Sequence, residues 1–193
     1  MELDNNYWSN RYSSHTAAWD MGQISTPLKA YFDQLTNKDI AILIPGCGNA
    51  YEAGYLLQKG FTNITLLDIS TFLCEQLEEK LAPYLSTGLK IICGDFFHHQ
   101  GQYDLIAEQT FFCALTPSLR KAYVEKTHEL LTPAGKLVGL LFNRQFDGGP
   151  PFGGSEPEYR ELFRQKFMVE MMAECYNSIA PRKGTELFIK LVK

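Results

Sequence analysis

Residues 39–50 are Asp-Ile-Ala-Ile-Leu-Ile-Pro-Gly-Cys-Gly-Asn-Ala, and residues 64–68 are Ile-Thr-Leu-Leu-Asp. Both stretches contain a short, continuous apolar run, which is typical of a strand buried on both faces of a parallel sheet. The segment between them, residues 51–59, has helical character and stops at Gly60, a residue suited to the left-handed conformation after a helix. Together these segments predict one β-α-β unit.

The same alternation of apolar runs and helical spacing continues along the chain. Ser70 is suited to cap a helix that runs towards residue 85, and Pro117 stands where the first turn of another helix tolerates proline. Further strands are predicted at residues 89–93, 103–109, 136–142, 168–176 and 187–192. The last two strands can close the sheet as an antiparallel hairpin. The pattern predicts an α/β fold with a mostly parallel sheet and flanking helices.

Residues 1–38 differ in kind from the rest of the chain. They carry both tryptophans, Trp8 and Trp19, and have the character of helical pieces that cover one edge of the sheet. We see no internal repeat and no low-complexity tract, and 193 residues lie near the commonest size of one domain. We therefore predict a single domain over residues 1–193, with residues 1–38 as its N-terminal covering segment.

Composition narrows the class of partner. A formal net charge of −4 offers no basic patch for nucleic acid or for an anionic membrane, so we expect a small-molecule partner. No apolar run approaches the roughly 20 residues needed to span a bilayer, and the acidic start is unlike a signal peptide. The five cysteines are scattered and without C-x-x-C spacing, as in reduced cytoplasmic proteins. We expect a cytoplasmic monomer.

His98 and His99 are adjacent in the sequence. Two neighbouring residues cannot supply the three or four converging ligands of a zinc site, and no nearby Cys or His completes a known spacing. We predict no metal site.

Polar and glycine residues follow the predicted strands at the edge where open α/β sheets bind ligands. Gly46 and Gly48 follow the first strand and allow a ligand to approach the backbone closely, although such turns also use glycine for structural reasons alone. Asp68 ends the second strand, where a carboxylate can accept ribose hydroxyls or, alternatively, serve the dipole of the next helix. Asp95 and Phe96 follow the third strand and offer an acceptor and an aromatic face for adenine.

The fourth predicted strand ends in Glu108, at the centre of the expected cleft. A buried carboxylate is costly without a partner, and a cationic sulfonium ligand would be such a partner. Tyr51 stands where a dinucleotide-binding turn would have its third glycine, which argues against a nicotinamide enzyme.

This combination of residues resembles the class I S-adenosylmethionine-dependent methyltransferases. Five stretches, in order over almost the whole chain, are similar to the thiopurine methyltransferase superfamily, and most of all to its thiol and halide branch, named in plants for harmless-to-ozone-layer proteins. These stretches are Trp-Asp-Met-Gly-Gln at 19–23, Pro-Gly-Cys-Gly at 45–48, Phe-Phe-Cys-Ala-Leu at 111–115, Gly-Gly-Pro-Pro-Phe at 148–152 and Arg-Lys-Gly at 182–184. The resemblance implies S-adenosylmethionine (SAM) as cofactor and a Rossmann-like, seven-stranded sheet with an N-terminal helical cover.

The resemblance also implies roles for individual residues. An N-terminal aromatic cluster would close over the cofactor, a glycine would contact it through the backbone, and acidic and aromatic residues would hold the ribose, the adenine and the methionine portion. The aromatic cluster is Trp8, Tyr12 and Trp19, and the glycine is Gly46. Asp68 would hold the ribose, Asp95 and Phe96 the adenine, and Glu108 the methionine portion. For each aromatic residue, ordinary core packing is the alternative interpretation.

The substrate chamber is predicted from Gln109, Phe111, Phe112 and Phe152, with the loop at residues 148–154 closing it. Gln109 stands where plant members of the branch carry tyrosine, so the resemblance leaves the methyl acceptor open. The lack of an evident catalytic His or Lys fits a soft nucleophile, because a thiol is already partly ionised at neutral pH and a sulfide or halide ion needs no base.

We therefore predict a SAM-dependent methyltransferase that acts on a small soft nucleophile: a thiol, a thiopurine, sulfide or a halide. The alternatives are an O- or N-methyltransferase of a small metabolite, and a non-catalytic SAM-binding module.

Overall fold

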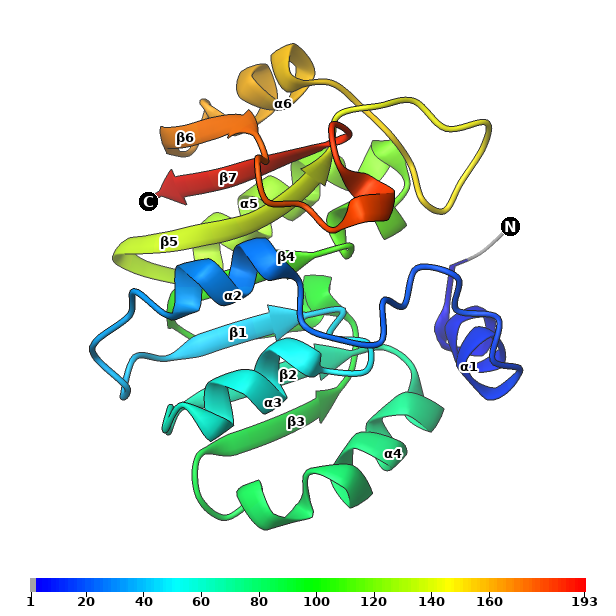
Figure 1. The fold of residues 1–193 in the computed structure, drawn as a ribbon, viewed down its shortest axis with the longest axis vertical. Coiled ribbons are helices and arrows are strands. Elements are labelled where there is room, and N and C mark those ends of the chain that lie inside the picture. The colour runs from blue at the N-terminus through cyan, green and yellow to red at the C-terminus, as the bar shows by residue number, and fades with distance from the viewer. Residues whose placement is uncertain (1–2) are drawn as a thin grey trace.

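A computed structural model describes residues 3–193 and contains one seven-stranded sheet in the order β3-β2-β1-β4-β5-β7-β6 (Figure 1). The strands are β1 (Ile42–Pro45), β2 (Ile64–Asp68), β3 (Leu89–Cys93), β4 (Tyr103–Gln109), β5 (Leu131–Phe142), β6 (Met168–Glu174) and β7 (Glu186–Val192). Neighbouring strands are parallel except that β7 pairs antiparallel with both β5 and β6. The predicted Rossmann-like, seven-stranded, mostly parallel sheet and its terminal antiparallel hairpin are confirmed.

Helices cover both faces of the sheet. They are α1 (Asn5–Ser13), α2 (Thr26–Phe32), α3 (Tyr51–Gln58), α4 (Thr71–Lys80), α5 (Arg120–Leu130) and α6 (Glu156–Phe163). In the view of Figure 1, α2, α3 and α4 lie in front of the sheet and α5 lies behind it. Each face has its own core: Leu28 and Leu56 belong to the first, and Tyr123 and Phe163 to the second. Both faces of the central strands are therefore buried.

Local sequence explains where α4 begins and where it ends. The Ser70 hydroxyl caps the helix by accepting a hydrogen bond from the Leu73 backbone N–H at 3.2 Å. The helix stops at Lys80 and gives way to a short 3₁₀ turn at Ala82–Tyr84, rather than running on to residue 85 as predicted. Pro83 lacks a backbone N–H and disfavours the helical conformation of the preceding residue, which accounts for the early end.

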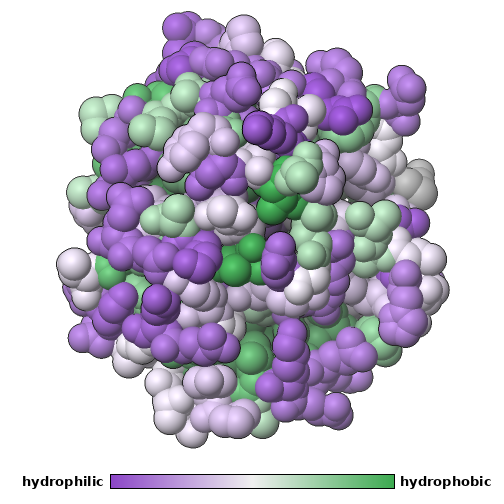
Figure 2. Space-filling model, viewed as in Figure 1, coloured by the Kyte–Doolittle hydropathy of each residue, from purple (hydrophilic) through white to green (hydrophobic). Residues whose placement is uncertain are grey.

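The carboxyl ends of β1 to β5 meet at one edge of the sheet, where α1, the loop at residues 143–155 and the turn η5 (Ala180–Arg182) come together (Figure 1). Figure 2 shows hydrophobic residues near the centre of the same view, surrounded by mainly hydrophilic ones. No helix among residues 3–193 combines the length and apolar character needed to cross a bilayer. The fold thus gathers its loops and its N-terminal segment at the edge where open α/β sheets bind ligands.

Candidate functional site

A cavity of about 840 Å³ lies at the carboxyl edge of the sheet. Its walls come from the N-terminal segment, the turn after β1, the ends of β2, β3 and β4, the loop after β5 and the turn before β7. The volume lies within the range of small-molecule sites, roughly 300–1,000 Å³.

The turn after β1 brings backbone close to the cavity. Gly46 and Gly48 both adopt positive φ, +55° and +51°, in the left-handed region that favours glycine. A Cβ atom added at Gly46 would lie 2.3 Å from the Phe111 ring, so no larger residue fits without displacing that side chain. The predicted contact residue Gly46 therefore lines the cavity through bare backbone.

Asp68 lies at the end of β2 and lines the cavity, although the residue is only 7% exposed. Its Oδ1 accepts a hydrogen bond from the Ser70 N–H at 3.0 Å, and its Oδ2 accepts one from the Gly48 N–H at 3.3 Å. Burial raises the pKa of this carboxyl, and the backbone N–H groups oppose that shift. A carboxylate has about four acceptor positions, so two remain for the hydroxyls of a ribose.

The end of β3 contributes the two residues predicted to contact adenine. The Asp95 carboxylate accepts a hydrogen bond from the Phe97 N–H at 2.9 Å and so caps the 3₁₀ turn η2 (Phe96–His98). The Phe96 ring packs edge-on against Phe111 with ring centroids 5.2 Å apart. Both Asp95 and Phe96 line the cavity, just after β3, the strand that pairs with β2 and its last residue Asp68.

Three aromatic residues of the N-terminal segment form the wall opposite the sheet. Trp19 packs edge-on against Trp8 at 5.4 Å and against Tyr12 at 5.8 Å, and the Arg11 guanidinium lies 5.2 Å from the Trp19 ring centre. All four side chains line the cavity. The structure thus brings the predicted aromatic cluster together as a cover over the sheet edge.

Asp20 fastens this cover to the start of α3. Its carboxylate accepts hydrogen bonds from the Asn49 amide and from the Tyr51 hydroxyl, the latter at 3.2 Å, and a further one from the Gly22 N–H at 2.8 Å. This accounts for the Trp-Asp-x-Gly motif, in which sequence reasoning assigned no role to the aspartate.

The predicted covering segment 1–38 is only partly a cover. Residues 1 and 2 lie outside the described residues, and the lining of the cavity runs from Leu3 to Pro27. Leu28 and Phe32 are instead buried in the core beneath α2, because the apolar face of that helix packs on the sheet.

The structure does not bring Glu108, which was predicted to contact the cofactor, to the cavity. Its side chain is fully buried and does not line the cavity. Oε1 accepts hydrogen bonds from the Phe111 and Phe112 N–H groups at 2.8 and 2.9 Å, and Oε2 accepts one from the Tyr123 hydroxyl at 2.8 Å. Desolvation by burial raises the pKa of Glu108 to about 7. Glu108 therefore braces the turn after β4 instead of facing a ligand.

Two of the four residues predicted to form the substrate chamber line the cavity. Gln109 and Phe111 line the cavity, whereas Phe112 and Phe152 do not. Phe112 is 1% exposed and packs among Tyr123, Tyr159 and Phe163 in the second core. Phe152 donates its N–H to the Cys113 carbonyl at 2.7 Å, and its ring lies against Gly149. The loop instead presents Pro150 and Pro151 to the cavity.

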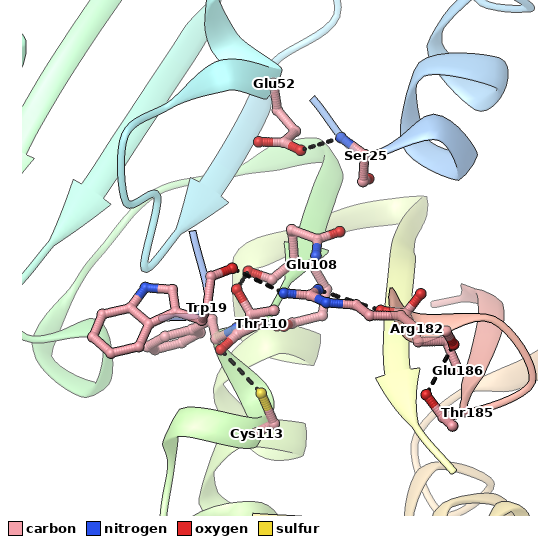
Figure 3. Close-up of polar contacts among 11 residues, drawn as sticks. Trp19, Ser25, Glu52, Glu108, Thr110, Cys113, Arg182, Thr185 and Glu186 are labelled. Carbon is pink, nitrogen blue, oxygen red and sulfur yellow. Dashed lines mark hydrogen bonds and ion pairs between the residues drawn. The ribbon is translucent and has the colours of Figure 1, made fainter. Parts of the chain in front are cut away.

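Sequence reasoning missed a buried polar wall. The Arg182 guanidinium lies 3.3 Å from the Glu186 carboxylate and donates to the Trp19 carbonyl at 2.9 Å (Figure 3). Glu52, in the first turn of α3, accepts from the Ser25 N–H at 3.2 Å, and burial raises its pKa. All five residues line the cavity. A basic turn between two strands is usually solvated, so nothing in the local sequence indicated this wall.

Comparison with known protein families identifies the family of this chain. The sequence profile of the family described as thiopurine S-methyltransferase matches residues 3–189. The chain belongs to that family. It is therefore a SAM-dependent methyltransferase, and the cavity with Gly46, Asp68 and the aromatic cover is its candidate cofactor site.

Two relatives agree with that assignment, and a solved structure has a similar fold. The chain is 30% identical to "Probable thiol methyltransferase 2" of Arabidopsis thaliana, over 93% of this chain and 81% of the relative. It is 26% identical to a thiopurine S-methyltransferase of Acinetobacter baylyi, over 94% of each chain. The crystal structure of magnesium protoporphyrin IX methyltransferase from Synechocystis with bound S-adenosylhomocysteine (SAH) matches with a TM-score of 0.76 at 14% identity, over 98% of this chain and 97% of that one. This last likeness concerns the fold.

Proposed function

We propose that this member of the thiopurine S-methyltransferase family transfers the methyl group of SAM to the sulfur of a small thiol or thione, with sulfide and halide ions as further acceptors. The observation that carries the proposal is the make-up of the cavity: among residues 3–193, no histidine and no lysine lines it. Alcohols and amines need a base near neutral pH, whereas a thiol with a pKa of about 8.5 is already partly ionised. The carboxylates that line the cavity, such as Glu52 and Glu186, already accept hydrogen bonds from protein donors, so a cavity without histidine or lysine suits a soft nucleophile.

The residues of the cavity fit SAM. The buried Asp68 carboxylate has acceptor positions left for ribose hydroxyls. Gly46 has no side chain, and a Cβ atom there would collide with Phe111, so its backbone remains accessible to a ligand. When bound, SAM supplies an electrophilic methyl group on a positively charged sulfur. The rings of Trp8, Tyr12 and Trp19 favour a cation near their faces and exclude water.

Alignment is the chain's main contribution to this reaction. A direct displacement requires the nucleophile, the methyl carbon and the leaving sulfur in line, and holding them so removes a large entropic part of the barrier. We assign the apolar part of the cavity, formed by Phe111, Phe142, Phe146, Pro150 and Pro151, to the acceptor. Gln109, at the end of β4, also lines the cavity. In the sequence it comes after the cofactor residue Phe96 and before the acceptor residue Phe111.

The names of the relatives support sulfur as the acceptor atom, because one is called a thiol methyltransferase and another a thiopurine S-methyltransferase. We further propose that the protein acts as a cytoplasmic monomer with a single domain. The scattered cysteines, which have no C-x-x-C spacing, support the cytoplasmic location.

A panel of acceptors tests the proposal. We expect methyl transfer from labelled SAM to small thiols and thiopurines with kcat/KM at least about tenfold above that for phenols or amines of similar size. Sulfide and iodide belong in the same panel. Activity confined to phenols or amines would replace the sulfur acceptor with oxygen or nitrogen. Tight binding of SAH without turnover of any acceptor would favour a SAM-binding module instead.

A further inference from the structure

Arg182 joins two parts of the cavity wall that are far apart in the sequence. It ends the turn η5 before β7, and its guanidinium reaches the Trp19 carbonyl across 163 positions of the chain, at 2.9 Å (Figure 3). Pro181 of the same turn and Ile179, which precedes the turn, line the cavity, as do Trp19 and Glu186. One side chain therefore links the C-terminal wall to the N-terminal cover.

Burial makes this link strong and directional. Arg182 is 7% exposed and Glu186 is 3% exposed, so their ion pair, at 3.3 Å, is poorly screened by solvent. The guanidinium also lies 5.4 Å from the centre of the Phe142 ring. Because its N–H groups form a rigid planar fork, pairing with Glu186 on one arm fixes the direction of the other arm, which donates to Trp19.

The carbonyl that Arg182 holds belongs to the central residue of the cover. The Trp19 ring contacts both Trp8 and Tyr12, and the next residue, Asp20, is bonded to Asn49 and Tyr51 at the start of α3. The cover is thus fastened on one side by Asp20 and on the other side by Arg182. If the Arg182 contact is lost, the Asp20 contacts remain, so the cover loosens without detaching.

We propose that Arg182 is a positioning residue: it holds the Trp19 backbone, and with it the aromatic cover, closed over bound cofactor. Glu186 acts through Arg182 by fixing the direction of its guanidinium. This inference rests on the proposed cofactor site but not on the identity of the methyl acceptor. The proposed role of Arg182 is to slow the release of the cofactor, not to contact the reacting atoms.

The substitution Arg182→Gln tests the inference directly. We expect the dissociation constant of SAH to rise about tenfold, the size expected for one lost hydrogen bond from a charged donor, chiefly through faster release. The two tryptophans of the protein, Trp8 and Trp19, both belong to the cover, so their emission reports on it. In Arg182→Gln without ligand, that emission should shift to longer wavelength as the rings become more exposed to water.

Lys183→Gln is the matched control, because Lys183 is the exposed neighbour and the substitution removes the same charge. Its SAH affinity and tryptophan emission should equal those of the wild type. Arg182→Lys keeps the charge without the fork, so we expect only partial recovery of SAH affinity. Arg182→Gln leaves Glu186 buried and unpaired; the double variant Arg182→Gln/Glu186→Gln removes that source of unfolding and should show the same loss of SAH affinity.

Wild-type SAH affinity and unshifted emission in both the single and the double variant would overturn the inference. So would a change confined to the KM of the acceptor, since that would make Arg182 an acceptor ligand. If the wild type itself fails to bind SAH, the proposed cofactor site fails and this inference fails with it. If the wild type binds SAH and only the Arg182 results disagree, the cofactor site stands.

Discussion

Replacing Asp68 by alanine is expected to raise the dissociation constant of SAH by about a hundredfold or more. Its carboxylate is 7% exposed, and two acceptor positions remain beside the bonds from Ser70 and Gly48. Two hydrogen bonds from ribose hydroxyls to a buried carboxylate contribute roughly 1.5–3 kcal/mol each. Calorimetric titration with SAH measures the loss. Asp68→Asn retains the shape and part of the acceptor capacity, so its loss should be smaller, about tenfold.

Asp104→Ala is the matched control for this experiment. Asp104 lies near the start of β4, at the opposite edge of the sheet, where its carboxylate also accepts a backbone N–H bond, from Ala41 at 2.9 Å. Asp104→Ala therefore loses a comparable structural contact but should bind SAH like the wild type. Thermal unfolding of all the variants separates lost binding from lost fold. Unchanged SAH affinity in a folded Asp68→Ala protein would place the cofactor elsewhere.

The strands were predictable because short apolar runs, ended or followed by polar or glycine residues, mark most of their boundaries. The runs at β2, β3 and β4 have the bounds that were predicted: β2 ends in the polar Asp68, β3 is followed by Gly94, and β4 is followed by Thr110. β5 begins at Leu131, earlier than predicted, because Leu131 pairs with Tyr103; the segment that contains Pro133, Ala134 with a φ of 62° and Gly135 is an irregularity, after which pairing resumes at Lys136. Pairing with β4, a tertiary effect, overrides the local signals there.

The position of a site residue was easier to predict than the direction of its side chain. The sequence predicted Asp68 and Asp95 at the edge where the cavity lies, because topology alone places the ends of parallel strands at one edge. Glu108 was misplaced because both faces of β4 are buried, and an apolar run gives no indication of which face each residue takes. The structure puts Glu108 on the same face as Ile106, towards the Tyr123 core, and leaves Gln109 to the cavity.

Contacts between residues far apart in the chain had no local signal in the sequence. In the sequence, Arg182 belongs to a basic turn, and Glu186 stands just before the strand predicted at residues 187–192. Their burial follows only once the C-terminal hairpin is folded against the N-terminal cover, which is how Arg182 comes to meet the Trp19 carbonyl. Such long-range polar pairs are set by tertiary packing, and no local periodicity encodes them.

Replacing Glu108 by glutamine is expected to stabilise the protein at alkaline pH and to leave it nearly unchanged at acidic pH. Burial raises the pKa of Glu108 from 4.5 to about 7, so folding favours its neutral form. The stability that this neutral form contributes is fully present below about pH 4.5, the unfolded value, and is lost as the pH rises through 7. Glutamine mimics the neutral acid: its carbonyl accepts from the Phe111 and Phe112 N–H groups, and its amide donates to the Tyr123 oxygen.

The expected gain at pH 8 is roughly 3 kcal/mol, from the raised pKa and about 1.4 kcal/mol per pKa unit. Urea unfolding of both proteins at pH 4.5 and pH 8 measures this gain. The test is how the difference in free energy of unfolding between variant and wild type changes from pH 4.5 to pH 8. Glu161→Gln, on an exposed residue of α6 paired with Arg164, makes the same chemical change without burial and should show no such pH dependence. If Glu108→Gln is instead the less stable protein at pH 8, the three hydrogen-bond donors around Glu108 outweigh its desolvation, and the carboxylate is charged in the folded protein.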